Sequence, residues 1–467
     1  MFVFKRFKRL LKDLMLVVSL GGIVGVYFVP PSRNLMDDSP APPPGASVLF
    51  RSPKSSTKPF DAMIQRSQQY EAKCKSLDLL DHSVVDTSKN NHTAHLPPFG
   101  FLKAAEDYQS NPPDYPYTCQ LPPENECSET QFTVIFMAYN PDRLQKLYNQ
   151  ILKMLQQDKG FKSLVREVVV VWNGERDVEE TTLGKALVDL TKTLPFRISY
   201  PLKAGFPNDL MNRYHPRLEI KTKAIMYYDD DGPFYSYKAT LGGFELWKRN
   251  ANAQIGAMAR KLDLDERQKV EKTELLQASG STTVDRFFIS HCPTDELNYN
   301  YFEFANFGAN MVLPSGSFLH SNYLCFLWHP IFEEIRQYVK EHPVKPDDGT
   351  VSAIVSHLSG RAPKVYSRRI NESKDPPHGR RLMKLHDKQD AIDWDNPGNH
   401  DTKMMWGRLR SDVANSLIRY FGSINSGSLG WCFNTPWQKG QNCKPEMAKI
   451  GYLPWMNEDH TPKSTCP

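Results

Sequence analysis

The stretch KAIMYYDDD, residues Lys223–Asp231, decides the fold that the sequence predicts. Its apolar part has the length and composition of a buried strand, and three aspartates follow where that strand would leave the sheet. Adjacent carboxylates repel one another. A divalent cation with oxygen ligands, Mg²⁺ or Mn²⁺, would offset their charge and share its open positions with a substrate phosphate. The alternative is a solvated acidic turn, because Gly232 and Pro233 follow directly.

Strand and helix patterns alternate upstream of this stretch. The apolar runs Phe132–Ala138 and Glu167–Trp172 are typical of buried strands, and Phe196–Tyr200 predicts a third, shorter one. Helical patterns lie between them, one capped by Asp142 and another near Val178–Leu190. The alternation predicts an α/β fold with a mostly parallel central sheet.

Polar residues follow three of these strands. Asn140 and Asn173 come after the first two, and Asp229, Asp230 and Asp231 end the strand of the opening stretch. Ligands of open α/β sheets bind at the carboxyl ends of the strands. We therefore expect these side chains to converge on one edge of the sheet.

Downstream of the aspartates the pattern becomes mainly helical. Helices are predicted at 236–249, 326–339, 347–357 and 404–421, and short strands at 254–258 and 310–313. The charged segments 262–282 and 368–403 predict an exposed helical insertion and a mobile loop or lid. The aromatic run 299–307 favours a sheet face over an acceptor platform.

The first part of the chain has the layout of a membrane-anchored protein. Leu14–Val29 is apolar and uncharged, follows a basic tail at 1–13, and lacks a small-residue cleavage site, which predicts a type II signal anchor. Prolines are frequent in residues 30–128, which predicts a largely irregular stem without a core, with one short helix within 60–80.

Charge and cysteines limit the remaining classes. The net charge of +5 is mild and partly local to the basic tail, which argues against a nucleic-acid-binding protein. The 8 cysteines form no CxxC pair, which argues against a zinc ribbon or a thioredoxin-like site. In a lumenal chain they permit disulfides, and Cys119–Cys127 and Cys432–Cys443 are candidate local bridges.

Six motifs occur in the order found in one protein family. They are MAYN at 137–140, VVVWN at 169–173, NR at 212–213 upstream of the DDD triplet, MVL at 311–313, PDD at 346–348 and LRS at 409–411. On these motifs, residues 130–425 resemble the exostosin-like glycosyltransferases of family 64. The resemblance predicts a GT-A domain over 129–425, followed by a Trp- and Cys-containing extension at 426–467.

What the resemblance implies is a retaining, metal-dependent glycosyltransferase of the Golgi or endoplasmic reticulum. The implied donor is a nucleotide sugar, UDP-GlcNAc or UDP-GalNAc first and GDP-mannose second, and the acceptor is a glycan or glycolipid. The implied cofactor is Mn²⁺, with Mg²⁺ as the alternative. By matching position, Asp231 would bind the metal, Asp348 would lie near the reacting carbon, and Arg410 would bind the donor phosphate or sugar. The donor would also be held by Asn140, Asn173, Asn208, Arg213, Asp229 and Asp230.

The chain departs from the family pattern in two places. Pro141 stands where the family often carries a basic residue, so one nucleotide contact is either missing or supplied by Arg143. Pro346 and Val413 stand where the family often has cysteines, as a lost disulfide would leave them. This double loss removes a brace from the loop that carries Asp348.

Two other functions use the same residues. A catalytically inactive relative would bind sugars or a partner enzyme, although such a protein has no need for the triplet, Asp348 and Arg410. A metal-dependent phosphohydrolase would need further ligands, for which His291 and His320 are candidates.

Overall fold

The computed structural model describes residues 58–76, 96–263, 298–300, 310–366 and 397–423. All of them belong to one compact unit, residues 55–467. The predicted anchor at 14–29, the bridge Cys432–Cys443 and the whole extension at 426–467 lie outside the described residues. Among the residues that are described, no helix is long and apolar enough to cross a membrane.

A seven-stranded sheet in the order β10-β5-β9-β4-β1-β2-β3 forms the centre of this unit. Its strands are β1 Phe132–Ala138, β2 Val165–Trp172, β3 Phe196–Ser199, β4 Ala224–Asp229, β5 Ile255–Gly256, β9 Ser317–His320 and β10 Lys364–Val365. Every neighbouring pair is parallel except those that β9 makes with β4 and β5. The prediction of an α/β fold with a mostly parallel sheet is confirmed.

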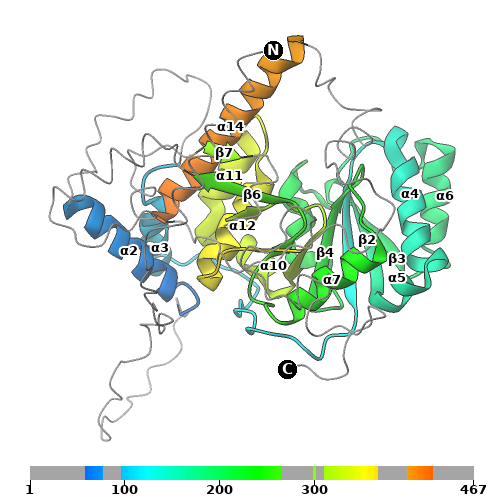
Figure 1. Cartoon of the computed structure of the whole chain (residues 1–467), viewed down its shortest axis with the longest axis horizontal. Coiled ribbons are helices and arrows are strands. Elements are labelled where there is room, and N and C mark those ends of the chain that lie inside the picture. The colour runs from blue at the N-terminus through cyan, green and yellow to red at the C-terminus, as the bar shows by residue number, and fades with distance from the viewer. Residues whose placement is uncertain (1–57, 77–95, 264–297, 301–309, 367–396, 424–467) are drawn as a thin grey trace, which may run out of the picture. The chain divides into compact units, whose positions relative to one another are not determined.

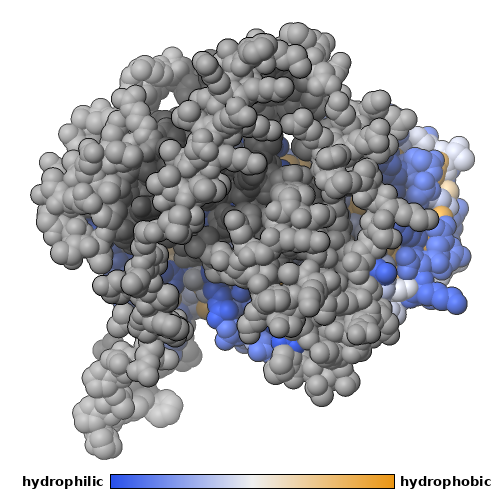
Figure 2. All heavy atoms as spheres, in the orientation of Figure 1, coloured by the Kyte–Doolittle hydropathy of each residue, from blue (hydrophilic) through white to orange (hydrophobic). Residues whose placement is uncertain are grey.

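Helices cover both faces of the sheet (Figure 1). One core cluster contains residues of α4 Leu144–Leu152, α5 Lys159–Leu164, α6 Thr182–Leu190 and α7 Tyr237–Lys248. The other contains residues of α2 Asp61–Ser76, α3 Gly100–Ser110, α10 Asn322–Leu327, α11 Glu333–Glu341, α12 Asp347–Ser359 and α14 Pro397–Phe421. Successive strand residues alternate between the clusters, as the pleat requires: Val134 and Phe136 join the first, and Ile135 and Met137 join the second. The visible outer surface over α4 and α6 is mostly hydrophilic (Figure 2).

Short helical turns and a small second sheet complete the described elements. The 3₁₀ turns are η3 Pro141–Arg143, η5 Val178–Glu180, η6 Leu202–Ala204, η7 Leu210–Tyr214, η8 Pro216–Leu218 and η10 Pro330–Phe332, and η4 Lys153–Gln157 is a π-helix. The second sheet pairs β6 Ala259–Asp263 with β7 Asn298–Asn300 and β8 Met311–Val312. The helical insertion predicted from residue 262 is wrong at its start, because 262 and 263 end β6, and 264–282 lie outside the described residues.

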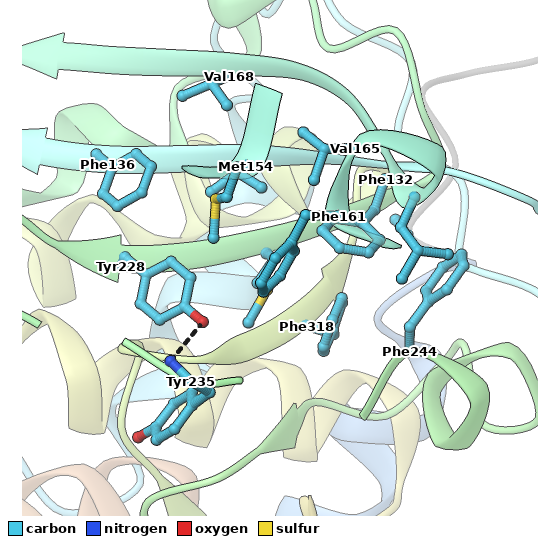
Figure 3. Packing of buried hydrophobic residues seen from close by; sticks show 14 of the residues in the cluster. Phe132, Phe136, Met154, Phe161, Val165, Val168, Tyr228, Tyr235, Phe244 and Phe318 are labelled. Atoms are coloured by element: carbon cyan, nitrogen blue, oxygen red, sulfur yellow. Dashed lines mark hydrogen bonds between the residues drawn. The ribbon is translucent and has the colours of Figure 1, made fainter. Parts of the chain in front are cut away.

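Aromatic packing holds the strands that carry the aspartates. The ring of Phe136 on β1 stacks on that of Tyr228 on β4, with centroids 5.5 Å apart. Phe132 meets Phe318 of β9 edge to face at 5.2 Å (Figure 3). The Tyr228 hydroxyl accepts a hydrogen bond from the Tyr235 amide at 3.4 Å, which ties the chain after the triplet back to β4. The end of β4 is thus rigidly placed.

The prediction that the stem contributes nothing to a core is wrong where the structure describes that segment. Helix α2 is the short helix expected within 60–80, and α3 was not predicted. Phe60 and Phe101 are buried and belong to the second core cluster. Prolines on either side of α3 end the helix without preventing it, and its apolar residues Phe101 and Ala105 lie one helical turn apart on the buried side.

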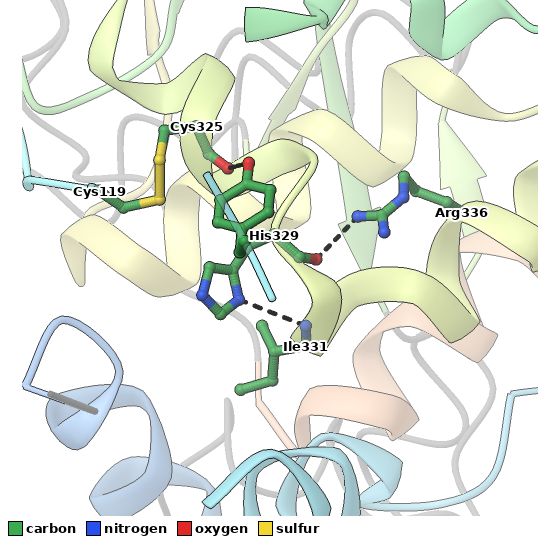
Figure 4. Close-up of a disulfide and its surroundings, with 6 residues drawn as sticks. Cys119, Cys325, His329, Ile331 and Arg336 are labelled. Carbon is green, nitrogen blue, oxygen red and sulfur yellow. Dashed lines mark hydrogen bonds between the residues drawn. A yellow bond between two sulfur atoms is a disulfide. The ribbon is translucent and has the colours of Figure 1, made fainter. Parts of the chain in front are cut away.

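The predicted bridge Cys119–Cys127 is also wrong. Cys119 is bonded to Cys325 of α10, 206 residues away, with Cα atoms 5.4 Å apart (Figure 4). Cys127 is in another disulfide. Pro122 and Pro123 favour extended chain between residues 119 and 127, so the segment does not close a local loop. The long bridge and the hydrogen bond that Tyr115 donates to the Cys325 carbonyl at 2.6 Å fasten this segment to α10.

Three helix predictions need correction. The helix expected at 326–339 is interrupted at Pro330, which cannot continue a helix, and His329 caps the turn that follows. Asp142 caps no helix, because Asn140 accepts the hydrogen bond that begins η3. Helix α14 starts at Pro397, inside the expected lid at 368–403, of which 368–396 lie outside the described residues.

Candidate active site

A cleft of about 330 Å³ lies where β1 and β4 end. Met137 of β1 pairs with Asp229 of β4, and Ala138 pairs with Trp172 of β2, so the three carboxyl ends share one sheet edge. Seven predicted site residues line the cleft: Arg143, Arg213, Asp229, Asp230, Asp231, Asp348 and Arg410. The last two come from α12 and α14, so elements far apart in the chain meet here.

The aspartate triplet differs in exposure from one residue to the next. The side chain of Asp230 is buried, whereas those of Asp229 and Asp231 are 41% and 48% exposed. Gly232 closes the turn at φ 90°, a conformation that favours glycine, and its amide donates to the Asp229 carbonyl at 3.2 Å. Asp231 therefore presents the most accessible carboxylate of the three to the cleft.

Arg143 supplies positive charge to the outer part of the triplet. Its Nη2 lies 2.6 Å from Asp231 Oδ2 and 3.8 Å from Asp230 Oδ1, and its Nη1 donates to the Tyr139 hydroxyl at 2.8 Å. Burial raises the pKa of Asp230 to about 6, Arg143 opposes this rise, and the neighbouring aspartates Asp231 and Asp229 add to it. One guanidinium thus offsets only part of the charge of the triplet.

Arg213 supplies positive charge to the inner part. Its side chain is 4% exposed; Nη1 donates to Asp229 Oδ1 at 2.7 Å, and Nη2 lies 2.9 Å from Asp347 Oδ2. Burial raises the pKa of Asp347 to about 7, while Arg213 opposes the rise and Asp348 adds to it. The ion pair joins the end of β4 to the first turn of α12, and so places Asp348.

The three predicted asparagines shape the surroundings of the cleft but do not line it. Buried Asn173 donates to Asn208 Oδ1 at 2.8 Å and to the Asp209 carbonyl at 3.0 Å, and its own Oδ1 accepts from Asn212 at 2.8 Å. Asn140 is the N-cap of η3 and accepts from a backbone amide at 2.9 Å. Asn173 therefore holds the loop that leads into η7 and Arg213. The contacts predicted for these asparagines with a nucleotide stay a prediction.

Asp348 and Arg410 face the cleft from two helices. Asp348 Oδ1 accepts from the Gly349 amide at 2.7 Å, at the start of α12. The Arg410 guanidinium lies 5.9 Å from the ring centre of Tyr299. Pro346 and Val413, which stand at the two family cysteine positions, line this same cleft. Apolar side chains thus occupy the part of the cleft where the resemblance places a disulfide.

Four polar cleft residues were not predicted: Tyr139, Tyr299, Lys345 and Asp347. Two of them stood inside quoted motifs, Tyr139 in MAYN and Asp347 in PDD, so their motif position was an available signal. Tyr299 was interpreted as part of a sheet face, which β7 confirms, yet it also borders the cleft. Lys345 has a φ of 45°, and no sequence pattern predicted that it would line the cleft.

A model of the glycosyl transferase family 64 domain matches residues 132–393, more than half of the chain. The chain belongs to glycosyltransferase family 64. The matched range contains every predicted site residue except Arg410, whose place in the site rests on the geometry of the cleft alone.

Several curated proteins are similar to shorter stretches of the chain. Exostosin-like-3 homolog of Caenorhabditis elegans is 25% identical over 241 residues, which are 51% of this chain and 23% of that protein. Exostosin-like 2 of Mus musculus is 30% identical over 134 residues, or 28% of this chain and 35% of that protein. Glucosamine inositolphosphorylceramide transferase 1 of Oryza sativa subsp. indica is 29% identical over 137 residues, which are 29% of this chain and 16% of that protein. The chain thus spans little more than a third of each relative at most.

One solved structure is also similar, the mannosyltransferase Ktr4p of S. cerevisiae in complex with GDP. It shares 13% identity and a TM-score of 0.27, and the match covers 64% of this chain and 81% of that one. A TM-score this low supports no argument about the site.

The donor atoms of the triplet suit a hard divalent ion. Asp230 Oδ2 is buried and makes no hydrogen bond within the described residues, and Asp231 is half exposed to the cleft. The part of the chain that the structure describes contains no group of three or more His, Cys, Asp or Glu arranged to hold a metal. Mg²⁺-type ions are commonly held by one or two carboxylates and substrate phosphates, so the residues present fit the ion that the resemblance implies.

Proposed function

We propose that this chain is a retaining, metal-dependent glycosyltransferase with a GT-A fold. It would transfer N-acetylhexosamine from UDP to a glycan or glycolipid acceptor. The observation that carries the proposal is the cleft, which gathers the triplet, Asp348 and Arg410 from β4, α12 and α14. In open α/β sheets, a cleft at the carboxyl ends of the strands that gathers charged residues is the usual place of a ligand site.

The cationic residues of the cleft suit a leaving nucleoside diphosphate. Breaking the bond between the anomeric carbon and the diphosphate oxygen places negative charge on the departing phosphate. Arg410 lines the cleft and would bind that phosphate, and a guanidinium held in a cleft stabilises growing negative charge more strongly than in water. A divalent cation at Asp231, Mn²⁺ or Mg²⁺, would supply further Lewis-acid charge when bound.

Asp348 would serve the sugar side of the reaction. Its carboxylate is fixed by the first turn of α12 and borders the same cleft as Arg410. A carboxylate there can stabilise the positive charge that develops on the anomeric carbon or orient the acceptor hydroxyl. Arg213 would hold Asp348 in place through Asp347, as well as contacting the donor.

The phosphohydrolase alternative loses one of its two candidate ligands. His320 pairs with Ala224 at the start of β4, the end of the strand opposite Asp229. It is buried, burial lowers its pKa to about 4, and its Nε2 lies 3.5 Å from Glu126. His291 lies outside the described residues. The inactive sugar-binding alternative stays open, because the arrangement of the cleft would serve binding as well.

The donor, the acceptor and the location are parts of the same proposal. The rice relative is named a glucosamine inositolphosphorylceramide transferase, which supports a hexosamine as the transferred sugar and a glycolipid as one acceptor class. GDP-mannose is the second donor to test. The proposed location is the Golgi or endoplasmic reticulum membrane, with the catalytic domain in the lumen and residues 14–29 as the anchor.

The test is release of UDP or GDP by the full-length chain in detergent, across a panel of UDP- and GDP-sugars, with Mn²⁺ or with EDTA. We expect one donor to be hydrolysed, EDTA to abolish the reaction, and Asp231→Asn to lower its rate by about 10²-fold or more. Asp142→Asn is the matched control, because Asp142 is an exposed carboxylate near the cleft that pairs with Arg176. No release from any donor, with no Mn²⁺-dependent thermal shift by UDP or GDP, would favour the binding protein.

A further inference from the structure

Arg143 holds its guanidinium against the carboxylate that the proposed function assigns to the metal. Its Nη2 is 2.6 Å from Asp231 Oδ2, while Nη1 donates to the hydroxyl of Tyr139 at 2.8 Å. The residue comes from the turn η3 directly after β1, where Pro141 takes the position of the family's usual basic residue. The positive charge that contacts the triplet therefore comes from Arg143, two residues after Pro141.

Each carboxylate of the triplet already faces a guanidinium. Asp229 Oδ1 accepts from Arg213 at 2.7 Å, Asp231 Oδ2 from Arg143 at 2.6 Å, and Asp230 Oδ1 lies 3.8 Å from Arg143. A hard divalent ion held by Asp231 would lie on the same carboxylate group, at about 2.1 Å from its oxygen for Mg²⁺. Two cations on one oxygen repel each other strongly. A bare ion at Asp231 therefore meets the repulsion of the Arg143 guanidinium, and that repulsion falls when Arg143 moves away.

We propose that Arg143 is a built-in counter-ion of the triplet that competes with the divalent cation at Asp231. The metal would then bind tightly only together with the nucleoside diphosphate. This inference rests on the proposed function, and it adds an order to ligand binding: metal and diphosphate enter as a coupled pair.

The two guanidiniums differ in how easily they can move. Arg213 is 4% exposed and is held by Asp229 and Asp347 together, so it stays in place. Arg143 is 32% exposed, and its two nearest partners, Asp231 and Tyr139, are 48% and 51% exposed. Ion pairs of exposed side chains restrain little. Arg143 is therefore the group that gives way when a metal ion arrives.

A released Arg143 has a partner when the diphosphate is present. Guanidinium groups bind phosphate oxygens with two parallel hydrogen bonds, and Arg143 lines the cleft that would hold the donor. The diphosphate would thus accept the cation that the metal displaces. By thermodynamic linkage, the nucleotide raises the metal affinity by the same factor by which the metal raises the nucleotide affinity.

The experiment measures Mn²⁺ binding to the full-length chain by the electron paramagnetic resonance signal of free Mn²⁺, alone and with UDP or GDP. We expect Arg143→Gln to bind Mn²⁺ alone about tenfold more tightly than the wild type, which is about 1.4 kcal/mol. The gain in Mn²⁺ affinity that UDP or GDP produces should shrink in the same variant. Tyr139→Phe, which removes one restraint on Arg143, should shift Mn²⁺ binding in the same direction by a smaller factor.

Arg176→Gln is the matched control for simple loss of charge. Arg176 is 51% exposed and pairs with Asp142 and Glu180 outside the cleft, so this variant should bind Mn²⁺ as the wild type does. Equal Mn²⁺ affinity of Arg143→Gln and wild type would overturn the inference, as would an equal gain in Arg176→Gln. Because binding is read without turnover, a chain that shows the expected Mn²⁺ pattern but hydrolyses no donor refutes the proposed function alone.

Discussion

Replacing Arg213 by Met tests whether its buried ion pair organises the site. The change leaves Asp347, whose side chain is 6% exposed, without the guanidinium 2.9 Å away. Removing one partner of a buried pair costs about 3–5 kcal/mol. Asp229 is 41% exposed, so its lost pair adds less than about 1 kcal/mol. We expect a free energy of unfolding lower by about 3 kcal/mol or more at pH 8.5, and a Tm lower by about 6 °C or more.

The pH dependence of this loss identifies the group responsible. Burial raises the pKa of Asp347 to about 7 in the folded chain, above its unfolded value of about 4. The folded state therefore binds the proton more tightly, and protonating Asp347 favours folding as the pH falls from 7 towards 4. Without Arg213 that pKa rises further. The difference in Tm between Arg213→Met and wild type should accordingly be largest at pH 8.5 and much smaller at pH 5.5.

The test is the thermal unfolding of four proteins at pH 8.5 and at pH 5.5. They are the wild type, Arg213→Met, the double variant Arg213→Met with Asp347→Asn, and Lys192→Met. The double variant has no unpaired charge at position 347 and should recover about 2 kcal/mol at pH 8.5. Lys192 pairs with Asp189 at the exposed surface, so its loss should leave Tm unchanged. A Tm deficit of Arg213→Met that is equal at both pH values would refute the assignment to Asp347.

Two further predictions concern the segment before β1. Replacing Cys119 and Cys325 by Ser should lower the free energy of unfolding by about 2–5 kcal/mol, because the bridge closes a 206-residue loop, and a non-reducing thermal melt with an unchanged Tm would contradict this. Deleting residues 1–128 should yield aggregated protein, since the deletion exposes the core that Phe60 and Phe101 cover. A deletion of residues 1–54 is the control. If the longer deletion gives a monodisperse protein that melts cooperatively, α2 and α3 are dispensable.

The central sheet was predictable because its signal is local. Phe132–Ala138 and the strand before the triplet are continuous apolar runs, and such runs occur where a strand is buried on both faces by helices. Once the strands are parallel, their polar ends must share an edge, which is why the place of Asp229–Asp231 followed from the pattern. The match of motifs then added Asp348 and Arg410, which no local pattern connects with β4.

The incorrect predictions concern features that have no local signal in the sequence. Contacts between segments far apart in the chain determine both the Cys119–Cys325 disulfide and the burial of Phe101 in the core. Proline content alone does not predict such contacts. Asn173 was predicted as a nucleotide ligand from its motif, and whether it binds a nucleotide is untested. Its amide is nonetheless engaged with Asn208 and Asn212, a use that only the folded loop reveals.

Charge explains how this chain places Asp348 without the bridge that its family often has. Pro346 and Val413 cannot form a disulfide, yet the start of α12 is tied to β4 by the buried contact of Arg213 with Asp347. Because this contact is an ion pair, it also affects the electrostatic potential in the cleft, which an uncharged disulfide would not do. The inner guanidinium is buried between two carboxylates, and the outer one, Arg143, is 32% exposed and pairs with the half-exposed Asp231. In the proposed function, the half of the site around Arg213 would position Asp348, and the half around Arg143 would move to admit a metal and a diphosphate.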